Sequence, residues 1–494
     1  MESSVLSKSE LAAPAHWTEA RRPRRTRPAQ AKYDAAQTTS ENSRHWLQAD
    51  HLSANAANSA FVRRILRNRS RYEVGNNSYA SAMVKTMAYD VVGTGPRLQL
   101  LTPDKVLNKR VETSFRDWAD EIRLAAKLRT MRMTRAVDGE VFAVKGSNRT
   151  LQSKIKLDLR LLEGDQVADP NDIMSGANPA DGITLDRYGN PKEYKVLRTH
   201  PGDTFMPSTF DFDVVPARSM IHWYRVDRPA QLRGIPETTP ALSLFSQLRR
   251  YILAILAAAE TAADFAAVLY SDGPATQGDT PDPMDVIELE RRMATVLPEG
   301  WKLGQMKPDA VTPVIREFKR EMLTEAFRCM LMPYNIGAGD SSDHNYASGR
   351  LDGQGYNRVV TIDRDDCRVF VLHSLMHTWF DLASLVGILP RELFEAGPVP
   401  HAWFWDGRGH DDPVKEEKAI DMRLGNRTSS YAREFAARGL DWEEEFAQIA
   451  KEQEMMQRLK ITPGQVSSRL SDESDETDED DLVDRVLEKV NEEK

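Results

Sequence analysis

Apolar residues recur at helical spacing over long parts of this chain, and one stripe is especially regular. Its residues follow one another at intervals of three or four positions: Leu107, Val111, Phe115, Trp118, Ile122, Ala125 and Leu128. That period places the side chains on one face of a helix. The pattern predicts one long helix over 103–136, with Thr102 as its N-cap and Pro103 in its first turn.

Further helices are predicted on both sides of this stripe. Residues 33–89 have a helical pattern that breaks at Gly75-Asn76-Asn77, and an alanine-rich helix is predicted from Ile235 to Val268. The latter contains Glu260 and Asp264, which are costly inside a bilayer, so we expect a packed helix and not a membrane span. Helices are also predicted from Met284, over Phe318–Met332, over Ser348–Val386, and as three short helices after Asp412, with Thr428 and Asp441 as N-caps and Gly425 and Gly439 at their ends.

Between these helical regions the period changes to two. Residues 155–161 alternate apolar and polar side chains, and residues 182–200 have the pattern of a hairpin around Tyr188-Gly189-Asn190-Pro191. An apolar stretch of strand length follows at 214–226. The chain is therefore predicted to be α+β, with a β-rich insert over about 140–226.

The net charge of −9 belongs to one end of the chain. Residues 471–494 carry twelve acidic and three basic side chains, whereas the other 470 residues balance 63 basic against 63 acidic ones. A protein that neutralises many phosphates is expected to be basic overall. The balance of charge excludes such a basic body here. The arm 1–31 is basic around Pro23 and Pro28 and is predicted to be disordered. It is either a tether to nucleic acid or an acidic partner, or a solvated tail.

Cysteine usage and the first residues indicate a cytoplasmic product. Cys329 and Cys367 are too few for a disulfide framework, and neither has metal-ligand spacing. No apolar core of secretory length follows the charges at the N-terminus.

Candidate catalytic residues are few. His373 and His377 share a helix face, but a zinc hydrolase of the HExxH type needs Glu where residue 374 is Ser. Asp363, Asp365 and Asp366 have the spacing of magnesium ligands in a nuclease, and equally that of a solvated helix. Gly93-x-Gly95 is predicted to be a turn, because no third glycine follows. We expect no catalytic residue, metal or cofactor.

Several short blocks of residues, called the motif residues below, occur in a fixed order along the chain: Asn76, Asn77, Gly93, Gly95, Gly139, Glu140, His222, Arg228, Pro229, Gln231, Arg233, Gly234, Pro236, Asp340, Asn345, Tyr346, Ser348, Arg350, Asp412, Pro413 and Lys415. In order and spacing over about 32–455, these blocks resemble the lambda-type portal protein family of tailed bacteriophages. One departure is Ala347-Ser348-Gly349, where the family more often has two serines and an alanine.

The resemblance implies a ring of copies of this chain, usually twelve, at one capsid vertex. DNA would pass through it without sequence specificity, driven by the terminase large subunit. The major capsid protein, the scaffold and a head–tail connector would be further partners, with assembly in the host cytoplasm and a place in the virion. No membrane partner is expected.

The family organisation maps onto the chain as follows: a disordered arm at 1–31, the N-terminal part of the wing at 32–149, a clip at 150–225, a stem-region helix at 226–270, the C-terminal part of the wing with channel-proximal helices at 271–411, a helical crown at 412–460, and a mostly disordered acidic tail at 461–494.

Two other functions stay open on the sequence alone. One is a metal-dependent nuclease or hydrolase using Asp363, Asp365, Asp366, His373 and His377, and the other is a scaffold or head-completion protein. The acidic tail is either a solvated tail or a segment that repels packaged DNA or binds a basic assembly partner.

Overall fold

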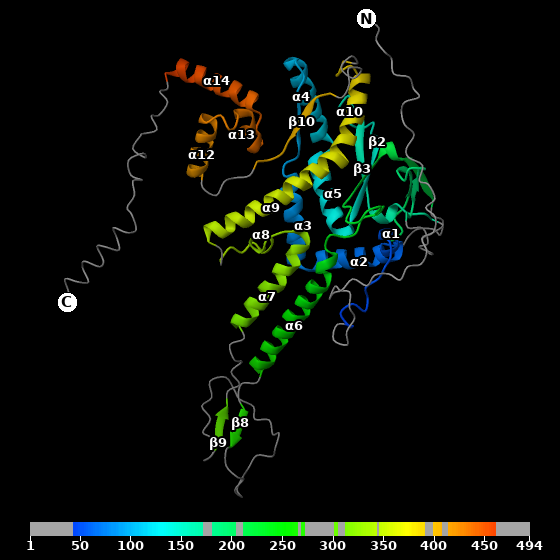
Figure 1. Cartoon of the computed structure of the whole chain (residues 1–494), viewed down its shortest axis with the longest axis vertical. Coiled ribbons are helices and arrows are strands. Elements are labelled where there is room, and N and C mark those ends of the chain that lie inside the picture. Colours follow the sequence, from blue (N-terminus) through cyan, green and yellow to red (C-terminus); the bar gives the residue numbers. More distant parts are fainter. Residues whose placement is uncertain are drawn as a thin grey trace, which may run out of the picture. The chain divides into compact units, whose positions relative to one another are not determined.

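The computed structural model describes residues 43–170, 180–203, 211–264, 268–271, 301–304, 312–342, 345–390, 399–407 and 413–460. The chain divides into two compact units, 1–53 and 54–494. All helices and strands below belong to the second unit (Figure 1). The arm 1–31, the helix expected from Met284 and the acidic tail lie outside the described residues.

Among the described residues, the helices of eight residues or more are α2 (Ala60–Asn76), α3 (Ser78–Val92), α4 (Lys105–Glu121), α5 (Leu124–Asp138), α6 (Leu242–Asp264), α7 (Thr312–Phe327), α9 (Tyr346–Cys367), α10 (His373–Leu385), α12 (Pro413–Gly425) and α14 (Trp442–Leu459). The shorter ones are α1 (Ala54–Ala57), α8 (Tyr334–Ala338) and α13 (Tyr431–Ala437). A π-helical turn, Arg368–Leu372, joins α9 to α10.

The strands of the described residues form four small antiparallel sheets. In the first two, β1 (Arg97–Leu100) pairs with β10 (His401–Phe404), and β2 (Glu140–Ser147) lies between β3 (Leu157–Leu162) and β7 (Met220–Tyr224). In the others, β5 (Pro191–Leu197) lies between β4 (Ile183–Leu185) and β6 (Phe212–Pro216), and β8 (Val268–Ser271) pairs with β9 (Trp301–Gly304). The mixture of helices and antiparallel strands confirms the α+β prediction, including the hairpin around Tyr188.

The prediction of one helix over 103–136 is wrong. The stripe is divided between α4 and α5, because Arg123 adopts a left-handed backbone conformation with φ of 54°. The N-cap is Asp104, and not Thr102: its carboxylate accepts hydrogen bonds from the backbone N–H groups of Val106 and Leu107. Val111, Phe115, Trp118 and Leu128 are all buried, so the apolar stripe itself was identified correctly.

Other predicted boundaries also need correction. The alanine-rich helix begins at Leu242 after a 3₁₀ turn, and not at Ile235. The stretch 214–226 contains parts of two strands, β6 and β7, separated by a 3₁₀ turn at Ala217–Ser219. The N-cap of α13 is Ser430 and not Thr428, whereas Asp441 caps α14 as predicted.

A large hydrophobic core joins the helices to the first sheets. It includes Met83 of α3, Trp118 of α4, Trp223 of β7 and Trp379 of α10. A second, smaller core around Phe142, Tyr194 and Val196 supports the sheet of β4, β5 and β6. The β-rich insert therefore packs against the helices through the first core, and the second core joins its two sheets to each other.

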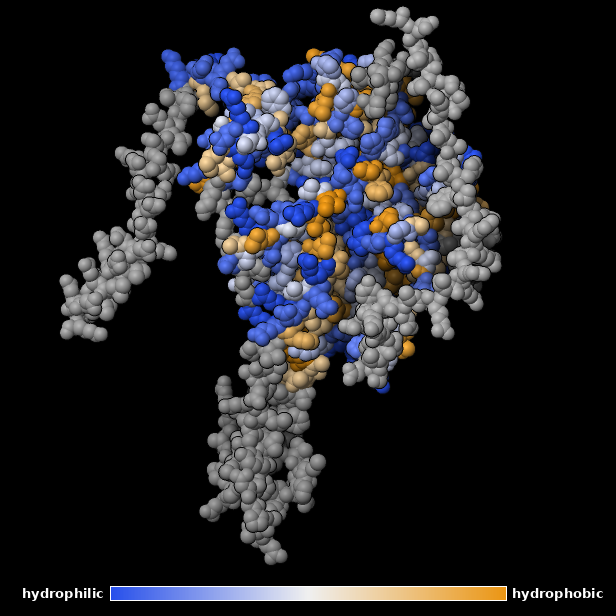
Figure 2. Space-filling view, in the orientation of Figure 1, coloured by the Kyte–Doolittle hydropathy of each residue, from blue (hydrophilic) through white to orange (hydrophobic). Residues whose placement is uncertain are grey.

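The alanine-rich helix α6 is packed only along its first part. Phe245 and Leu248 are buried, whereas Ile252, Leu253 and Leu256 are exposed. Figure 2 shows apolar side chains over this part of the molecule. Thr239–Glu260 is the one stretch of the described residues with the length and composition of a membrane-crossing helix, with 22% of it buried and a mean hydropathy of 1.3.

Candidate functional site

The carboxylate of Glu140 lies at the centre of a buried polar junction that gathers many of the motif residues. Glu140 begins β2 and is fully buried. Arg233 donates to it from Nε at 2.9 and 3.0 Å and from Nη2 at 2.7 Å, and Arg67 of α2 forms a second ion pair with it. The backbone N–H of Gly234 also donates to Oε2 at 3.1 Å, while Nε2 of His222 lies 3.0 Å from the same oxygen. Both carboxylate oxygens are thus fully used.

Electrostatics keep this carboxylate ionised. Burial by itself would raise the pKa of Glu140, but the guanidinium groups of Arg233 and Arg67 hold it well below the usual range. Burial lowers the pKa of His222, whose ring is stacked between Phe142 and Tyr224. The junction therefore has the chemistry of a buried ion pair and offers no base to a substrate.

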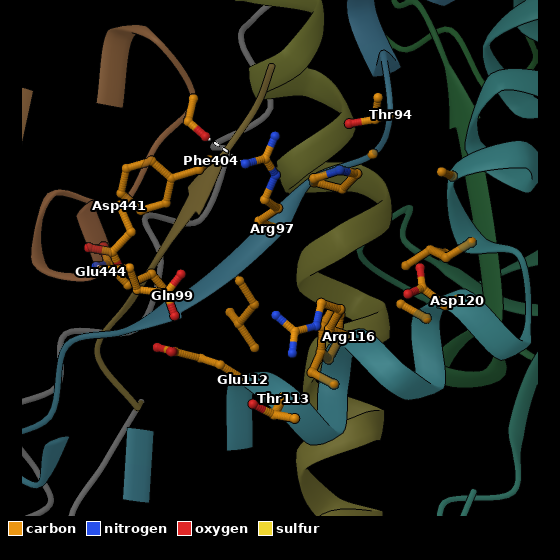
Figure 3. Close-up of a pocket in the computed structure, with 18 of the residues that line it drawn as sticks. Thr94, Arg97, Gln99, Glu112, Thr113, Arg116, Asp120, Phe404, Asp441 and Glu444 are labelled. Carbon is orange, nitrogen blue, oxygen red and sulfur yellow. Dashed lines mark hydrogen bonds between the residues drawn. The ribbon is translucent and has the colours of Figure 1, made fainter. Parts of the chain in front are cut away.

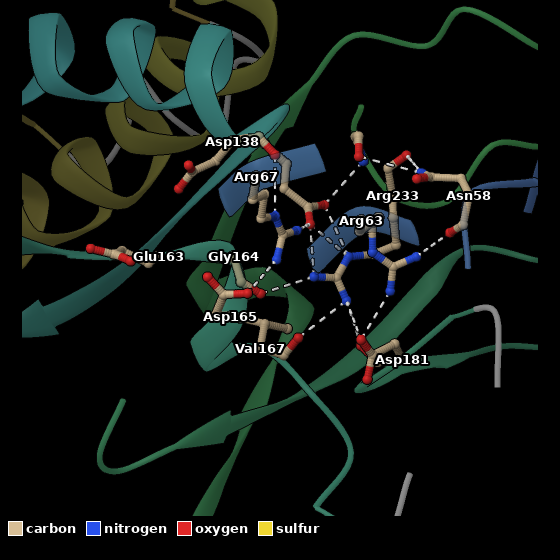
Figure 4. Close-up of polar contacts among 12 residues, drawn as sticks. Asn58, Arg63, Arg67, Asp138, Glu163, Gly164, Asp165, Val167, Asp181 and Arg233 are labelled. Carbon is tan, nitrogen blue, oxygen red and sulfur yellow. Dashed lines mark hydrogen bonds and ion pairs between the residues drawn. The ribbon is translucent and has the colours of Figure 1, made fainter. Parts of the chain in front are cut away.

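Arg233 and Arg63 extend the junction towards the sheet of β4, β5 and β6 (Figure 4). Arg233 donates to the carbonyl oxygens of Val167 and Gly164, both at 3.1 Å. Arg63 of α2 donates to Asp181 Oδ2 at 2.9 Å. These contacts connect α2, the 3₁₀ turn at Gly164–Gln166 and the start of β4, so the junction fixes the β-rich insert against the helices.

Two motif glycines allow the backbones to meet beside Glu140. Gly139 has φ of 88°, and a Cβ at this position would lie 2.3 Å from the carbonyl carbon of Ile235. A Cβ on Gly234 would lie 2.1 Å from the carbonyl oxygen of Gly139. Side chains are excluded at both positions, so these glycines serve the close approach of two segments.

A second buried junction joins α5 to α9. Arg132 donates to Asp363 Oδ2 at 2.6 Å and to Glu237 Oε2 at 3.0 Å, and Arg135 donates to Glu237 Oε1 at 2.9 Å. Burial alone would raise the pKa of Glu237, but Arg132 and Arg135 lower it to about 2. Sequence reasoning missed this cluster, because nothing local marks an arginine as buried.

The five residues considered for a hydrolase are not brought together. Asp363 is buried between Arg132 and Arg135, and Asp365 forms a surface ion pair with Arg368 at 2.8 Å. Asp366 lies 4.0 Å from Arg135. His373 follows ten residues after Asp363 in the same helical run, a separation of about 15 Å. One metal ion cannot be held by both groups.

Four other motif residues, Asn77, Asn345, Ser348 and Gln231, act in caps and in a loop. Asn77 caps α3 and Asn345 caps α9, the latter with Ser348 in a reciprocal capping box. Oε1 of Gln231 accepts from the backbone N–H groups of Asp227 and Arg228, which closes the Arg228-Pro229 loop. Asp412 lies outside the described residues. The motif residues named above thus organise backbone and buried charge, and among the side chains that the structure describes they do not form one exposed reactive site.

A cavity of about 280 Å³ lies where the C-terminal helices meet β1 and α4 (Figure 3). Gln99 donates to Asp441 Oδ2 at 2.7 Å, and Arg97 donates to the carbonyl oxygen of Gly439 at 2.7 Å. Burial raises the pKa of Glu112, which lines the same cavity. These polar contacts hold the start of α14 against the first half of the chain.

Two comparisons with known proteins agree with each other. The family model described as "Phage portal protein, lambda family" matches residues 39–364. A protein of Halomonas phage phiHAP-1, described as "Probable portal protein", is 23% identical over 434 residues, which cover 80% of this chain and 81% of that protein.

Solved structures of gene transfer agent (GTA) particles are also similar at 14% sequence identity. A chain from the neck of an empty particle, computed with C6 symmetry, has a TM-score of 0.45 and is matched over 74% of this chain and 91% of its own length. A chain from the virion of the native particle has a TM-score of 0.42, with 76% and 92% covered.

Proposed function

Because this chain belongs to the lambda family of phage portal proteins, we propose that its copies close into a ring, of twelve subunits by the family pattern, through which the genome enters and leaves the capsid. The chain is a portal protein and therefore a structural component of a phage particle. In the proposed role, the terminase large subunit drives double-stranded DNA inward, and head–tail connector proteins attach to the same ring. The major capsid protein and scaffold surround it during assembly in the host cytoplasm.

The exposed apolar part of α6 supports a ring most directly. Leu253 and Leu256 are 59% and 54% exposed, and Ala254, Ala257 and Ala258 beside them are exposed as well. A helix that is apolar on most sides is normally covered by protein or lipid. In a portal protein the natural cover is the same helix of adjacent subunits, since small side chains permit close helix contacts and a heterologous interface repeated by rotation closes into a ring.

Polar contacts favour protein over lipid as that cover. Arg249 lies in the same helix and donates to both carboxylate oxygens of Glu73 at 2.9 and 3.1 Å, which fixes α6 to α2. Arg250 and Glu260 add two further charges to the stretch 239–260. A second copy accommodates such charges at the rim of an interface, whereas a bilayer does not.

We propose that α6 and α7 together form the stem. They contact each other, and the ring of Tyr251 lies 4.7 Å from the ring of Phe318 in an edge-on arrangement. The hairpin of β8 and β9 lies between these helices in the chain. This position supports the hairpin as the clip. The insert 150–225 is the earlier candidate, but Leu157, Leu159 and Trp223 of its strands lie in the main core.

We propose that the helices α12, α13 and α14 form the crown. The sheet of β2, β3 and β7 and the sheet of β4, β5 and β6, together with α2 to α5, would then form most of the wing. A body with balanced charge suits a conduit, because dense phosphate neutralisation would retard moving DNA. The same balance of charge keeps the non-specific affinity of the ring for DNA low, so the ring would not compete with the terminase for DNA.

Electron microscopy of the purified chain tests the ring. We expect closed rings with an axial hole, and we expect the double variant Leu253→Glu/Leu256→Glu to be a folded monomer with unchanged secondary structure by circular dichroism. Tyr188→Glu, at an exposed hairpin turn, is the matched control and should still form rings. Monomers in the unchanged protein, or vesicle insertion in place of rings, would refute the proposal.

A packaging assay separates the two candidates for the clip. Replacing 272–300 by a short Gly-Ser linker should leave rings intact but abolish DNA packaging. Charge reversal at Lys192 and Arg198, in the insert, should leave packaging unchanged. The opposite pair of results would place the clip in 150–225.

A further inference from the structure

The helix α14 packs against its neighbour α13 only along its first part (Figure 1). The ring of Phe446 lies 5.2 Å from the ring of Tyr431 and 5.8 Å from that of Phe435, both of α13. None of the 18 residues of α14 is buried. Its second half presents a row of apolar side chains, called the apolar strip below, which are 37% to 58% exposed: Ile449, Met455, Met456 and Leu459.

The spacing of the apolar strip is that of a packing face. Met456 follows Ile449 by seven residues and Leu459 follows Met456 by three, which places the three side chains on one side of the helix. At 1.5 Å per residue, the strip is about 15 Å long. Most helical stability in proteins comes from packing of such a face, and an isolated helix of this length is marginal in water. The second half of α14 therefore needs a cover.

We propose that the apolar strip binds residues 482–490 of the same chain, which lie outside the described residues. This segment has apolar side chains at i, i+1, i+4, i+5 and i+8, a pattern that predicts one face of a helix. As a helix its apolar face would be about 12 Å long, close to the length of the strip. The side chains of this face are Leu482, Val483, Val486, Leu487 and Val490.

Charge favours an antiparallel arrangement of the two helices. Arg458 and Lys460 give the end of α14 a positive charge. Four acidic residues directly precede the apolar segment: Asp478, Glu479, Asp480 and Asp481. In an antiparallel pair this acidic run lies beside the basic end of α14, where opposite charges attract. A parallel pair would place it beside the acidic first turn, Glu443–Glu445, where like charges repel.

The connection favours a segment of the same chain over a second copy. The 22 residues 460–481 lie between α14 and the segment. They can span at most about 70 Å, several times the length of the strip, so the chain can reverse its direction. A short tether also keeps the segment at an effective concentration of the order of mM, whereas a second molecule must lose translational and rotational freedom to bind.

Docking of 482–490 closes the acidic run of the tail into a loop. Residues 472–481 contain eight acidic side chains. With α14 on one side and the docked segment on the other, this loop presents its charge at one place on the C-terminal helices. A basic partner would then bind it with a smaller loss of conformational entropy than it would a free tail. The docking concerns a single subunit and is independent of the proposed ring.

Disulfide formation between introduced cysteines tests the docking in the full chain. Met456→Cys and Val486→Cys face each other in the antiparallel register, so mild oxidation should link them within one chain. Lys451→Cys with Val486→Cys is the matched control. Because Lys451 lies on the other side of α14, this pair should link at least about tenfold more slowly. The natural thiols of Cys329 and Cys367 do not interfere, since burial raises the pKa of both.

Hydrogen exchange gives an independent readout. The double variant Val486→Asp/Leu487→Asp places charge in the proposed contact, and amides of 449–459 should then exchange at least about tenfold faster. Ser467→Asp/Ser468→Asp adds the same charge to the tail outside the apolar segment and should leave this exchange unchanged.

Three outcomes would overturn the proposal. A disulfide-linked product with the mass of two chains would show that a second copy covers the apolar strip. Equal rates of linking in the two cysteine pairs would show that 482–490 has no fixed place on α14. Unchanged exchange of 449–459 in Val486→Asp/Leu487→Asp would show that the segment does not protect the strip.

Discussion

The Nε of Arg132 donates to Oδ2 of Asp363 at 2.6 Å, in the buried junction between α5 and α9. The two residues are separated by 231 positions in the chain. This contact decides how Asp363 functions: its carboxylate balances buried guanidinium groups and is not available as a metal ligand.

Replacing Asp363 by Asn should destabilise the subunit strongly. Arg132 and Arg135 would lose a shared buried counter-charge, and removing one partner of a buried pair costs about 3–5 kcal/mol. The urea midpoint of the purified chain measures this loss. Asp365→Asn is the matched control, because its pair with Arg368 is solvent-exposed and should contribute less than about 1 kcal/mol. A comparable loss in both variants would contradict the assigned role.

Gly139→Ala should be much more damaging than Gly189→Ala. Both glycines have positive φ, 88° and 86°, so backbone strain is similar in the two variants. Only at Gly139 would the added Cβ meet backbone, and we expect a cost of about 3 kcal/mol or more there. At Gly189 nothing lies within 4 Å, and strain alone should cost about 1–2 kcal/mol. Chemical denaturation compares the two, and equal losses would show that the close contact with Ile235 is unimportant.

The free energy of unfolding should decrease as the pH falls through the range in which Glu237 takes up a proton. Its pKa is about 2 in the folded chain and about 4.3 in an unfolded one. The unfolded state therefore binds the proton first, and the stabilisation is complete above pH 4.3 and lost as pH falls towards 2. The expected contribution is about 3 kcal/mol. Urea midpoints between pH 6 and pH 2 measure it, and Glu237→Gln should show a flatter dependence.

Asp406→Ala should loosen the pairing of β1 with β10. Asp406 accepts hydrogen bonds from Thr94 Oγ1 at 2.7 Å and from Arg97 Nη2 at 2.9 Å, and so ties the turn before β1 to the end of β10. We expect faster hydrogen exchange of the amides in 97–100 and 401–404. Asp340→Ala also removes an aspartate that accepts from a nearby hydroxyl, but in a separate turn. Exchange in both strands should stay unchanged in that control.

The sequence alone determined the parts of this protein that depend on neighbouring residues. The apolar stripe of α4 and α5, the hairpin around Tyr188 and the N-cap at Asp441 follow from spacing and local hydrogen bonding. The ordered motif residues indicated the portal family, which the family model confirms. Local patterns also misplaced boundaries, because the left-handed turn at Arg123 has no glycine to mark it.

Only the tertiary structure decided which distant residues meet. The pairing of β1 with β10 connects residues 97–100 to 401–404, and neither strand is long enough to be identified by alternation. Buried ion pairs such as those of Glu140 and Asp363 depend on the low dielectric of the interior, which no local pattern reveals. Contact across hundreds of residues, as between Arg132 and Asp363, is set by packing of the whole chain and not by sequence spacing.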